Sequence, residues 1–151
     1  MRTLISKSNL RFFLIPLLFI ILFVRCDDNE IPFPNVNVYA NLSLDTQLGN
    51  VLVGNYVEVD EHGVGGLIIF RADQNEFMAF DRACTYEASR TCKLEIYSEN
   101  NSFFECTCCK SRYWMAGTAD IAGSVYQGPS SYALKQYKCY FDGINTVRVV
   151  N

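Results

Sequence analysis

The chain has 151 residues, a formal net charge of −3, 50% hydrophobic residues and seven cysteines. This length suggests one domain, and the composition excludes intrinsic disorder and collagen-like repeats. No cluster of Lys and Arg with interleaved aromatic residues is present. We therefore expect no nucleic-acid partner, because contacts to phosphates require such a cluster.

The first 25 residues have the pattern of an export signal. Basic residues precede an apolar run from Phe12 to Val24, which Pro16 interrupts. A membrane-spanning helix needs about 20 apolar residues, whereas a basic start and a shorter apolar run are typical of a secretory signal. Because Cys26 follows closely, residues 1–25 resemble a bacterial lipoprotein signal, which implies that Cys26 carries the lipid. A retained N-terminal anchor helix is the alternative.

Removal of this signal changes the charge and the compartment. Without residues 1–25, 9 Lys and Arg remain against 16 Asp and Glu, for a net charge of −7. We expect a bacterial lipoprotein in the periplasm or on the cell surface, attached to the membrane through its lipid. Residues 26–35 form an acidic tether and residues 36–151 the folded domain. Export implies an oxidising compartment in which disulfides persist, and the six remaining cysteines allow 15 pairings.

The folded part has the pattern of short β-strands. Apolar and polar residues alternate over residues 36–44, as in a half-buried strand. Three pairs of apolar runs flank turn residues and predict hairpins: 67–70 with 77–80, 93–97 with 102–105, and 132–141 with 146–150. No segment keeps a helical period over three turns, so the fold class is predicted to be all-β with antiparallel strands.

Four cysteines lie where predicted strands end. Cys84 follows the run at 77–80, and Cys106, Cys108 and Cys109 follow the run at 102–105. Residues on loops that rigid strands hold in place are suited to bind a ligand or metal. Two such loops carrying cysteines predict a clamp for a metal ion or a cluster.

These loops resemble a known family. Residues 106–113 read CTCCKSRY and are similar to the second cluster box of Rieske iron–sulfur domains, Cys-Pro-Cys-His-Gly-Ser-x-Phe/Tyr. Residues 84–86 read CTY and resemble the first box, Cys-Thr-His. The resemblance covers about residues 36–150. It implies a Rieske-like antiparallel β-sandwich or barrel, with a small cluster-binding subdomain formed by two hairpin loops.

The resemblance also implies a ligand set, and this chain departs from it. Cys84 and Cys106 stand at the two cysteine positions, while Tyr86 and Cys109 stand where the family has its two histidines. The single histidine of the chain, His62, lies outside both boxes. An ordinary Rieske centre, with two Cys and two His ligands, is therefore excluded by composition.

Other residues of the resemblance surround the expected cluster. Ser111 matches a hydroxyl that hydrogen-bonds a bridging sulfide, and Tyr113 matches a phenol that hydrogen-bonds a ligand thiolate. Gly128 and Pro129 match a segment that closes over the cluster. Lys110 stands where the family has glycine, so a change in the loop backbone is expected there.

The leading hypothesis is an exported lipoprotein that binds an atypical [2Fe–2S]-like cluster for one-electron transfer. Cys84, Cys106 and Cys109 would hold it, with Tyr86 as a further candidate ligand. Anionic ligands favour oxidised iron, so the potential is expected below that of a His-ligated centre. The partner would be an unidentified redox or binding protein, and we expect no enzymatic activity.

Three alternatives remain open. The first is a cluster-free, disulfide-stabilised binding or scaffolding lipoprotein. The resemblance implies a disulfide from Cys108 to position 89, where this chain has Ser89, so Cys92 is the candidate partner of Cys108. The second is a structural zinc site made by the Cys106-x-x-Cys109 pair with Cys84 and Cys92. The third is thiol exchange by Cys106-x-x-Cys109, although no helical pattern follows it. Cys139 is expected to be a buried, inert thiol.

Overall fold

The structure is a computed structural model that describes residues 32–115 and 119–151. The predicted signal peptide, Cys26 and most of the tether lie outside these residues. Within them there are no helices, so none that could cross a membrane. The described residues form ten strands, which confirms the all-β prediction. The strands are β1 Tyr39–Ser43, β2 Tyr56–Val59, β3 Leu67–Arg71, β4 Phe77–Asp81, β5 Leu94–Ile96, β6 Phe103–Cys106, β7 Arg112–Trp114, β8 Val125–Gln127, β9 Gln136–Phe141 and β10 Thr146–Val150.

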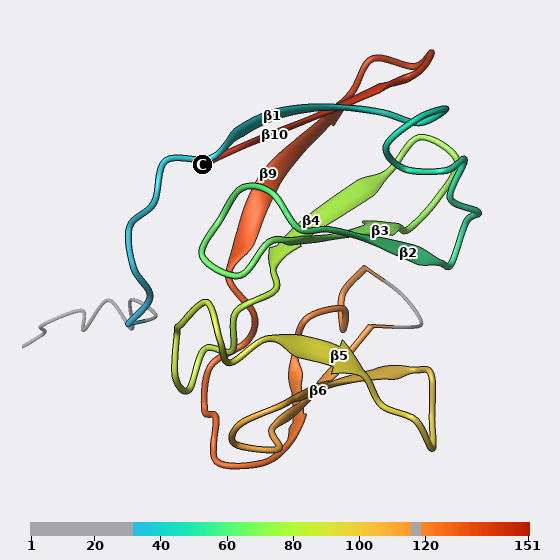
Figure 1. Ribbon diagram of the computed structural model, residues 1–151. Coiled ribbons are helices and arrows are strands. Elements are labelled where there is room, and N and C mark those ends of the chain that lie inside the picture. The colour runs from blue at the N-terminus through green and yellow to red at the C-terminus, as the bar shows by residue number, and fades with distance from the viewer. Residues whose placement is uncertain (1–31, 116–118) are drawn as a thin grey trace, which may run out of the picture. The chain divides into compact units, whose positions relative to one another are not determined.

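Six strands form the larger sheet, in the order β1-β10-β9-β4-β3-β2 (Figure 1). All pairs are antiparallel, and the first strand of the domain pairs with the last, Tyr39 opposite Val150. The alternation that predicted β1 is visible in its burial, because Ala40 and Leu42 face the core while Tyr39 is exposed.

Four strands form the smaller sheet, in the order β5-β6-β7-β8. Its buried face packs against one face of β3 and β4, through residues such as Ile68, Phe80 and Phe104, while Leu67 and Ala79 on the other face belong to a second core. Strands β3 and β4 are thus buried on both faces. This explains why their sequences are continuously apolar rather than alternating.

The predicted hairpins are present, although several strand limits differ. The three paired runs become β3–β4, β5–β6 and β9–β10. Strand β9 begins at Gln136 rather than at 132, because Leu134 N instead donates to Gly123 O at 2.8 Å. Three strands were missed: β2, β7 and β8. They are three or four residues long and show no clear alternation in burial.

A buried carboxylate joins the end of β4 to the loop before β3. Asp81 is fully buried and accepts hydrogen bonds from the backbone N–H groups of Val64, Gly65 and Ala83 at 2.7–2.9 Å. Tyr137 donates its hydroxyl to the same carboxylate at 2.8 Å. Four donors compensate for the loss of water around this group. The loop that leads to Cys84 therefore leaves the sheet from a fixed point.

Candidate functional site: a buried group of three thiols

Three cysteines converge where two loops meet. Cys84 lies in the loop after β4, Cys106 ends β6, and Cys109 lies in the turn between β6 and β7. Their sulfur atoms all lie within 4.8 Å of one another, and Cys84 Sγ is 3.5 Å from Cys109 Sγ. The fold thus gathers three of the residues that the sequence pattern selected, from two loops more than 20 residues apart.

The turn that carries Cys109 depends on an unusual backbone conformation. Lys110 N donates to Cys106 O at 3.1 Å, and Cys106 N donates to Ser111 O at 2.8 Å, which closes the turn. Lys110 has φ +61°, a left-handed conformation that costs a non-glycine residue free energy. Lys110 therefore holds a backbone conformation that glycine would adopt more easily. That the loop departs from the family's loop stays a prediction.

Hydroxyl groups surround two of the three sulfurs. The buried Tyr113 hydroxyl lies 3.3 Å from Cys84 Sγ, and Cys109 Sγ lies 3.1 Å from Ser111 Oγ. Hydroxyl donors next to sulfur stabilise a thiolate and tune any metal that it binds. The structure thus places Ser111 and Tyr113 beside the thiols, as the resemblance implies.

The three thiols differ in exposure and in acidity. Cys84 and Cys106 are fully buried, whereas Cys109 is half-buried. Burial raises the pKa of Cys106 to about 12. Burial acts in the same direction on Cys109, but hydrogen bonds from the Ser111 hydroxyl and backbone outweigh it, so the pKa of Cys109 lies below its ordinary value. Cys109 is therefore the more reactive thiol at the solvent side of the group.

The segment after β8 covers the group. Ser130 N donates to Ser111 Oγ at 3.0 Å. Gly128 has φ +119°, and a Cβ there would lie 2.4 Å from Ser111 Cα, so no larger residue fits between this segment and the turn. Pro129 follows directly. Gly128 therefore packs closely on Ser111 in the turn that carries Cys109. Closure of Gly128 and Pro129 over a cluster stays a prediction.

Sequence reasoning missed two residues of this network. The Thr85 hydroxyl lies 3.1 Å from the Tyr113 hydroxyl and 3.0 Å from Ser130 Oγ, and it donates to Tyr132 O at 2.8 Å. Thr85 and Ser130 are both buried. Thr85 lies between Cys84 and Tyr86, and Ser130 follows Pro129, so both belong to motifs that the sequence analysis singled out. A polar residue inside such a motif could have indicated a buried hydrogen-bonding role.

A disulfide joins the two thiol loops. Cys92 and Cys108 are bonded, the pair that the resemblance implies, with 5.3 Å between their Cα atoms. The four-cysteine zinc site is therefore wrong, because the sulfur of Cys92 is not free to bind a metal. Thiol exchange assisted by a helix also finds no support, since β7, not a helix, follows Cys109.

Tyr86 does not join the thiol group through any contact among the described residues. Its side chain is 58% exposed, and it lies two residues after the buried Cys84. Its role as a further ligand stays a prediction. Cys139, on β9, is half-buried against the larger core rather than fully buried as expected. Burial raises its pKa to about 12, which favours an inert thiol.

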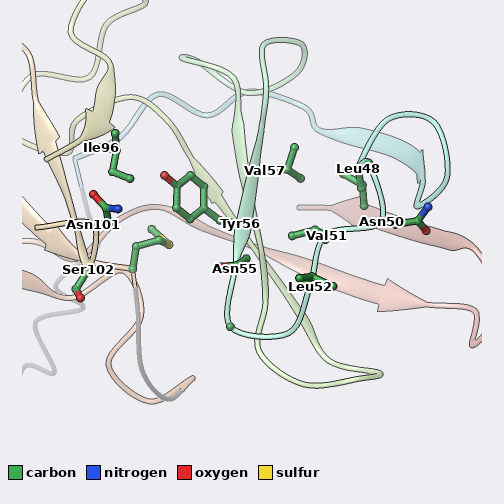
Figure 2. A pocket seen from close by; sticks show the side chains of 13 residues that line it. Leu48, Asn50, Val51, Leu52, Asn55, Tyr56, Val57, Ile96, Asn101 and Ser102 are labelled. Atoms are coloured by element: carbon green, nitrogen blue, oxygen red, sulfur yellow. The ribbon is translucent and has the colours of Figure 1, made fainter. Parts of the chain in front are cut away.

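A separate groove of about 720 Å³ lies between the loop before β2 and the β5–β6 hairpin (Figure 2). Figure 2 shows the Tyr56 ring pointing toward Ile96 and Asn101 across it. Met115, buried in the same core as the thiol group, also lines the groove, but none of its described lining residues is a cysteine. Sequence reasoning had not identified this groove.

Fold and site together define an all-β protein with a buried three-thiol site between two disulfide-linked loops. No family model and no curated protein matches the chain. Among solved structures, it is similar to a Sphingomonas yanoikuyae B1 ferredoxin, with 18% identity, a TM-score of 0.47, and coverage of 76% of this chain and 99% of that chain.

Two further structures are similar. A chain from the complex of reduced oxygenase and oxidised ferredoxin in carbazole 1,9a-dioxygenase is 15% identical, with a TM-score of 0.45 and coverage of 75% and 93%. A putative NADH-dependent nitrite reductase small subunit from Mycobacterium tuberculosis is 13% identical, with a TM-score of 0.44 and coverage of 78% and 97%.

Proposed function

We propose that this chain is an electron carrier that holds a [2Fe–2S]-like cluster through Cys84, Cys106 and Cys109. The observation that carries the proposal is the convergence of three thiols within 4.8 Å. Cysteine thiolates are the preferred ligands of such clusters. Tyr86 or solvent at the exposed side would complete the ligand set.

The groups around the thiols suit a redox centre. The hydroxyls of Tyr113 and Ser111 lie beside Cys84 and Cys109. Once these thiols are ionised, both hydroxyls could donate to them, which would stabilise thiolate charge and raise the potential. Burial of Cys84 and Cys106 excludes water from one side, and the half-buried Cys109 leaves the other side open to a partner protein. The bound cluster would supply the one-electron chemistry, and the chain would supply ligands, hydrogen bonds and protection from solvent.

The remaining parts of the function are proposals from sequence. The lipid on Cys26 would attach the protein to a bacterial membrane, on the periplasmic side or at the cell surface. The partner would be a protein that exchanges single electrons with the centre. We propose no enzymatic activity for the chain itself.

A second candidate follows from the closeness of the three sulfurs. Two thiolates on different irons are separated by both iron atoms, whereas thiolates on one tetrahedral zinc, with bonds of about 2.3 Å, lie about 3.8 Å apart. The distance of 3.5 Å between Cys84 and Cys109 is close to the second value. A single thiophilic ion held by three thiolates is therefore the rival metal centre, and a metal-free scaffolding domain is the third outcome.

Metal and sulfide analysis separates these outcomes. The reduced protein is incubated anaerobically with iron and sulfide, and bound iron, acid-labile sulfide and the visible spectrum are measured. A cluster gives about two irons and two sulfides per chain, and the Cys109→Ser variant should lose most of both. Cys139→Ser is the matched control and should load normally. Colourless protein with one bound ion supports the rival centre, and protein without any metal overturns both.

A further inference from the structure

Two free thiols of the site are in contact while a neighbouring pair is already bonded. We propose that Cys84 and Cys109 form a reversible disulfide when the site is empty, so that only the reduced protein can be loaded. The regulatory part of this inference rests on the proposed function, whereas formation of the bond does not. The carrying observation is the 3.5 Å separation of the two sulfurs.

The backbone near both thiols is already held in place. Cys108, bonded to Cys92, is the residue before Cys109, and Cys84 N donates to Cys92 O at 3.1 Å. The existing disulfide thus fixes the loop of Cys84 and the loop of Cys109 next to each other. A disulfide bond is about 2.05 Å long, so the two sulfurs, now 3.5 Å apart, must move about 1.5 Å closer for the bond to form.

The third thiol is a weaker candidate for pairing. Cys106 lies within 4.8 Å of both other sulfurs, but the described side chains place only Cys84 and Cys109 in hydrogen-bonding contact. Cys106 also ends β6, where the ladder to β5 and the bond from its N–H to Ser111 O restrain it. The contact between Cys84 and Cys109 and the restraints on Cys106 favour the Cys84–Cys109 pairing.

The exposure of the thiols sets the order of reaction. Cys109 is half-buried and Cys84 fully buried, so a small disulfide oxidant reaches Cys109 first. The Cys109 sulfur attacks the oxidant, forms a mixed disulfide and releases one thiol. Cys84 then attacks the Cys109 sulfur and releases the second thiol. The two cysteines lose two electrons and two protons in total, and the oxidant is reduced to two thiols.

The bond would remove two of the three metal ligands at once. Cys106 alone cannot hold a cluster or an ion, and its burial isolates it from replacement ligands. Reduction restores the thiols and thus the site. In the oxidising compartment predicted for this chain, loading would then require reduction first.

Disulfide mapping tests the bond itself. The full chain is reduced, freed of reductant, incubated anaerobically with oxidised glutathione, alkylated and mapped by peptide mass spectrometry. We expect a Cys84–Cys109 link in addition to Cys92–Cys108. The link should persist in Cys106→Ser, the matched control, and disappear in Cys109→Ser. Full alkylation of Cys84 and Cys109 after Cys92–Cys108 has formed, or a link from either to Cys106, would overturn the inference.

Loading of the same samples with iron and sulfide separates the two proposals. If the reduced protein takes up iron and the oxidised protein does not, both the cluster and the regulatory disulfide are supported. A Cys84–Cys109 link in a protein that takes up no iron when reduced refutes the cluster but keeps the disulfide. Iron uptake without any link under oxidation refutes the disulfide but keeps the cluster. Equal uptake with the link intact shows that the bond does not regulate loading.

Discussion

The contact between Gly128 and the thiol turn gives the sharpest test of the site. A Cβ at Gly128 would lie 2.4 Å from Ser111 Cα and 2.8 Å from Ser111 Oγ, and the residue has φ +119°. Alanine there is strained in its backbone, at a cost of about 1–3 kcal/mol. The overlap with Ser111 backbone forces a shift that costs about 1–3 kcal/mol more. We therefore expect Gly128→Ala to lower the free energy of unfolding by about 2–6 kcal/mol.

Gly143 offers a matched control. It has φ +80° in the β9–β10 turn, and a Cβ there would meet nothing within 4 Å. Gly143→Ala should therefore lower the free energy of unfolding only through backbone strain, by about 1–2 kcal/mol. Urea unfolding followed by the fluorescence of Trp114, the single tryptophan, measures both variants.

A local measurement shows where the damage lies. Ser130 N donates to Ser111 Oγ, so displacement of this segment should loosen the cover over the thiols. Alkylation of the fully buried Cys84 under native conditions should be faster in Gly128→Ala than in Gly143→Ala. If the two variants lose the same stability and Cys84 reacts equally slowly in both, the close packing of Gly128 on Ser111 is refuted.

Three further predictions concern the frame of the site. Asp81→Asn places an amide N–H against the backbone N–H groups that now donate to the Asp81 carboxylate, and should lower the free energy of unfolding in urea by about 2 kcal/mol or more. The exposed control Asp45→Asn should change it little. Equal losses in the two variants would contradict this prediction. Lys110→Gly should gain about 1 kcal/mol by removing the strain at φ +61°, while Lys110→Ala keeps the strain and should gain nothing. Hydrogen bonds from backbone N–H groups, that of Thr146 most strongly, lower the pKa of Asp142 to about 2. The ionised carboxylate therefore stabilises the fold fully above its unfolded pKa of about 4. This contribution is lost as the pH falls through about 2. The stability difference between wild type and Asp142→Asn should accordingly shrink between pH 4 and 2, and a difference independent of pH would refute this role.

Strands with clear patterns were predictable from sequence, and those without were not. Alternation predicted the first strand, and Asp142–Gly143 predicted the last hairpin, because a pleated strand and a tight turn impose local rules on residue type. Strands β2, β7 and β8 contain residues that favour strands, but they are only three or four residues long, so no alternating pattern stands out. The continuous apolar runs of β3 and β4 became intelligible only when both faces proved to be covered.

The sequence by itself determined the all-β class, the two loops that carry cysteines, and the absence of histidine from those loops, because these depend on residue type and order. The tertiary structure decided which sulfurs meet. Distances between residues 84, 106 and 109 depend on the packing of two sheets, which no local rule encodes. It also showed that Cys92 is bonded to Cys108, that Lys110 holds a left-handed backbone conformation, and that Thr85 links Tyr113 to Ser130. Composition shows only that the chain has seven cysteines, whereas the packing of the fold brings the sulfurs of three of them within 4.8 Å of one another.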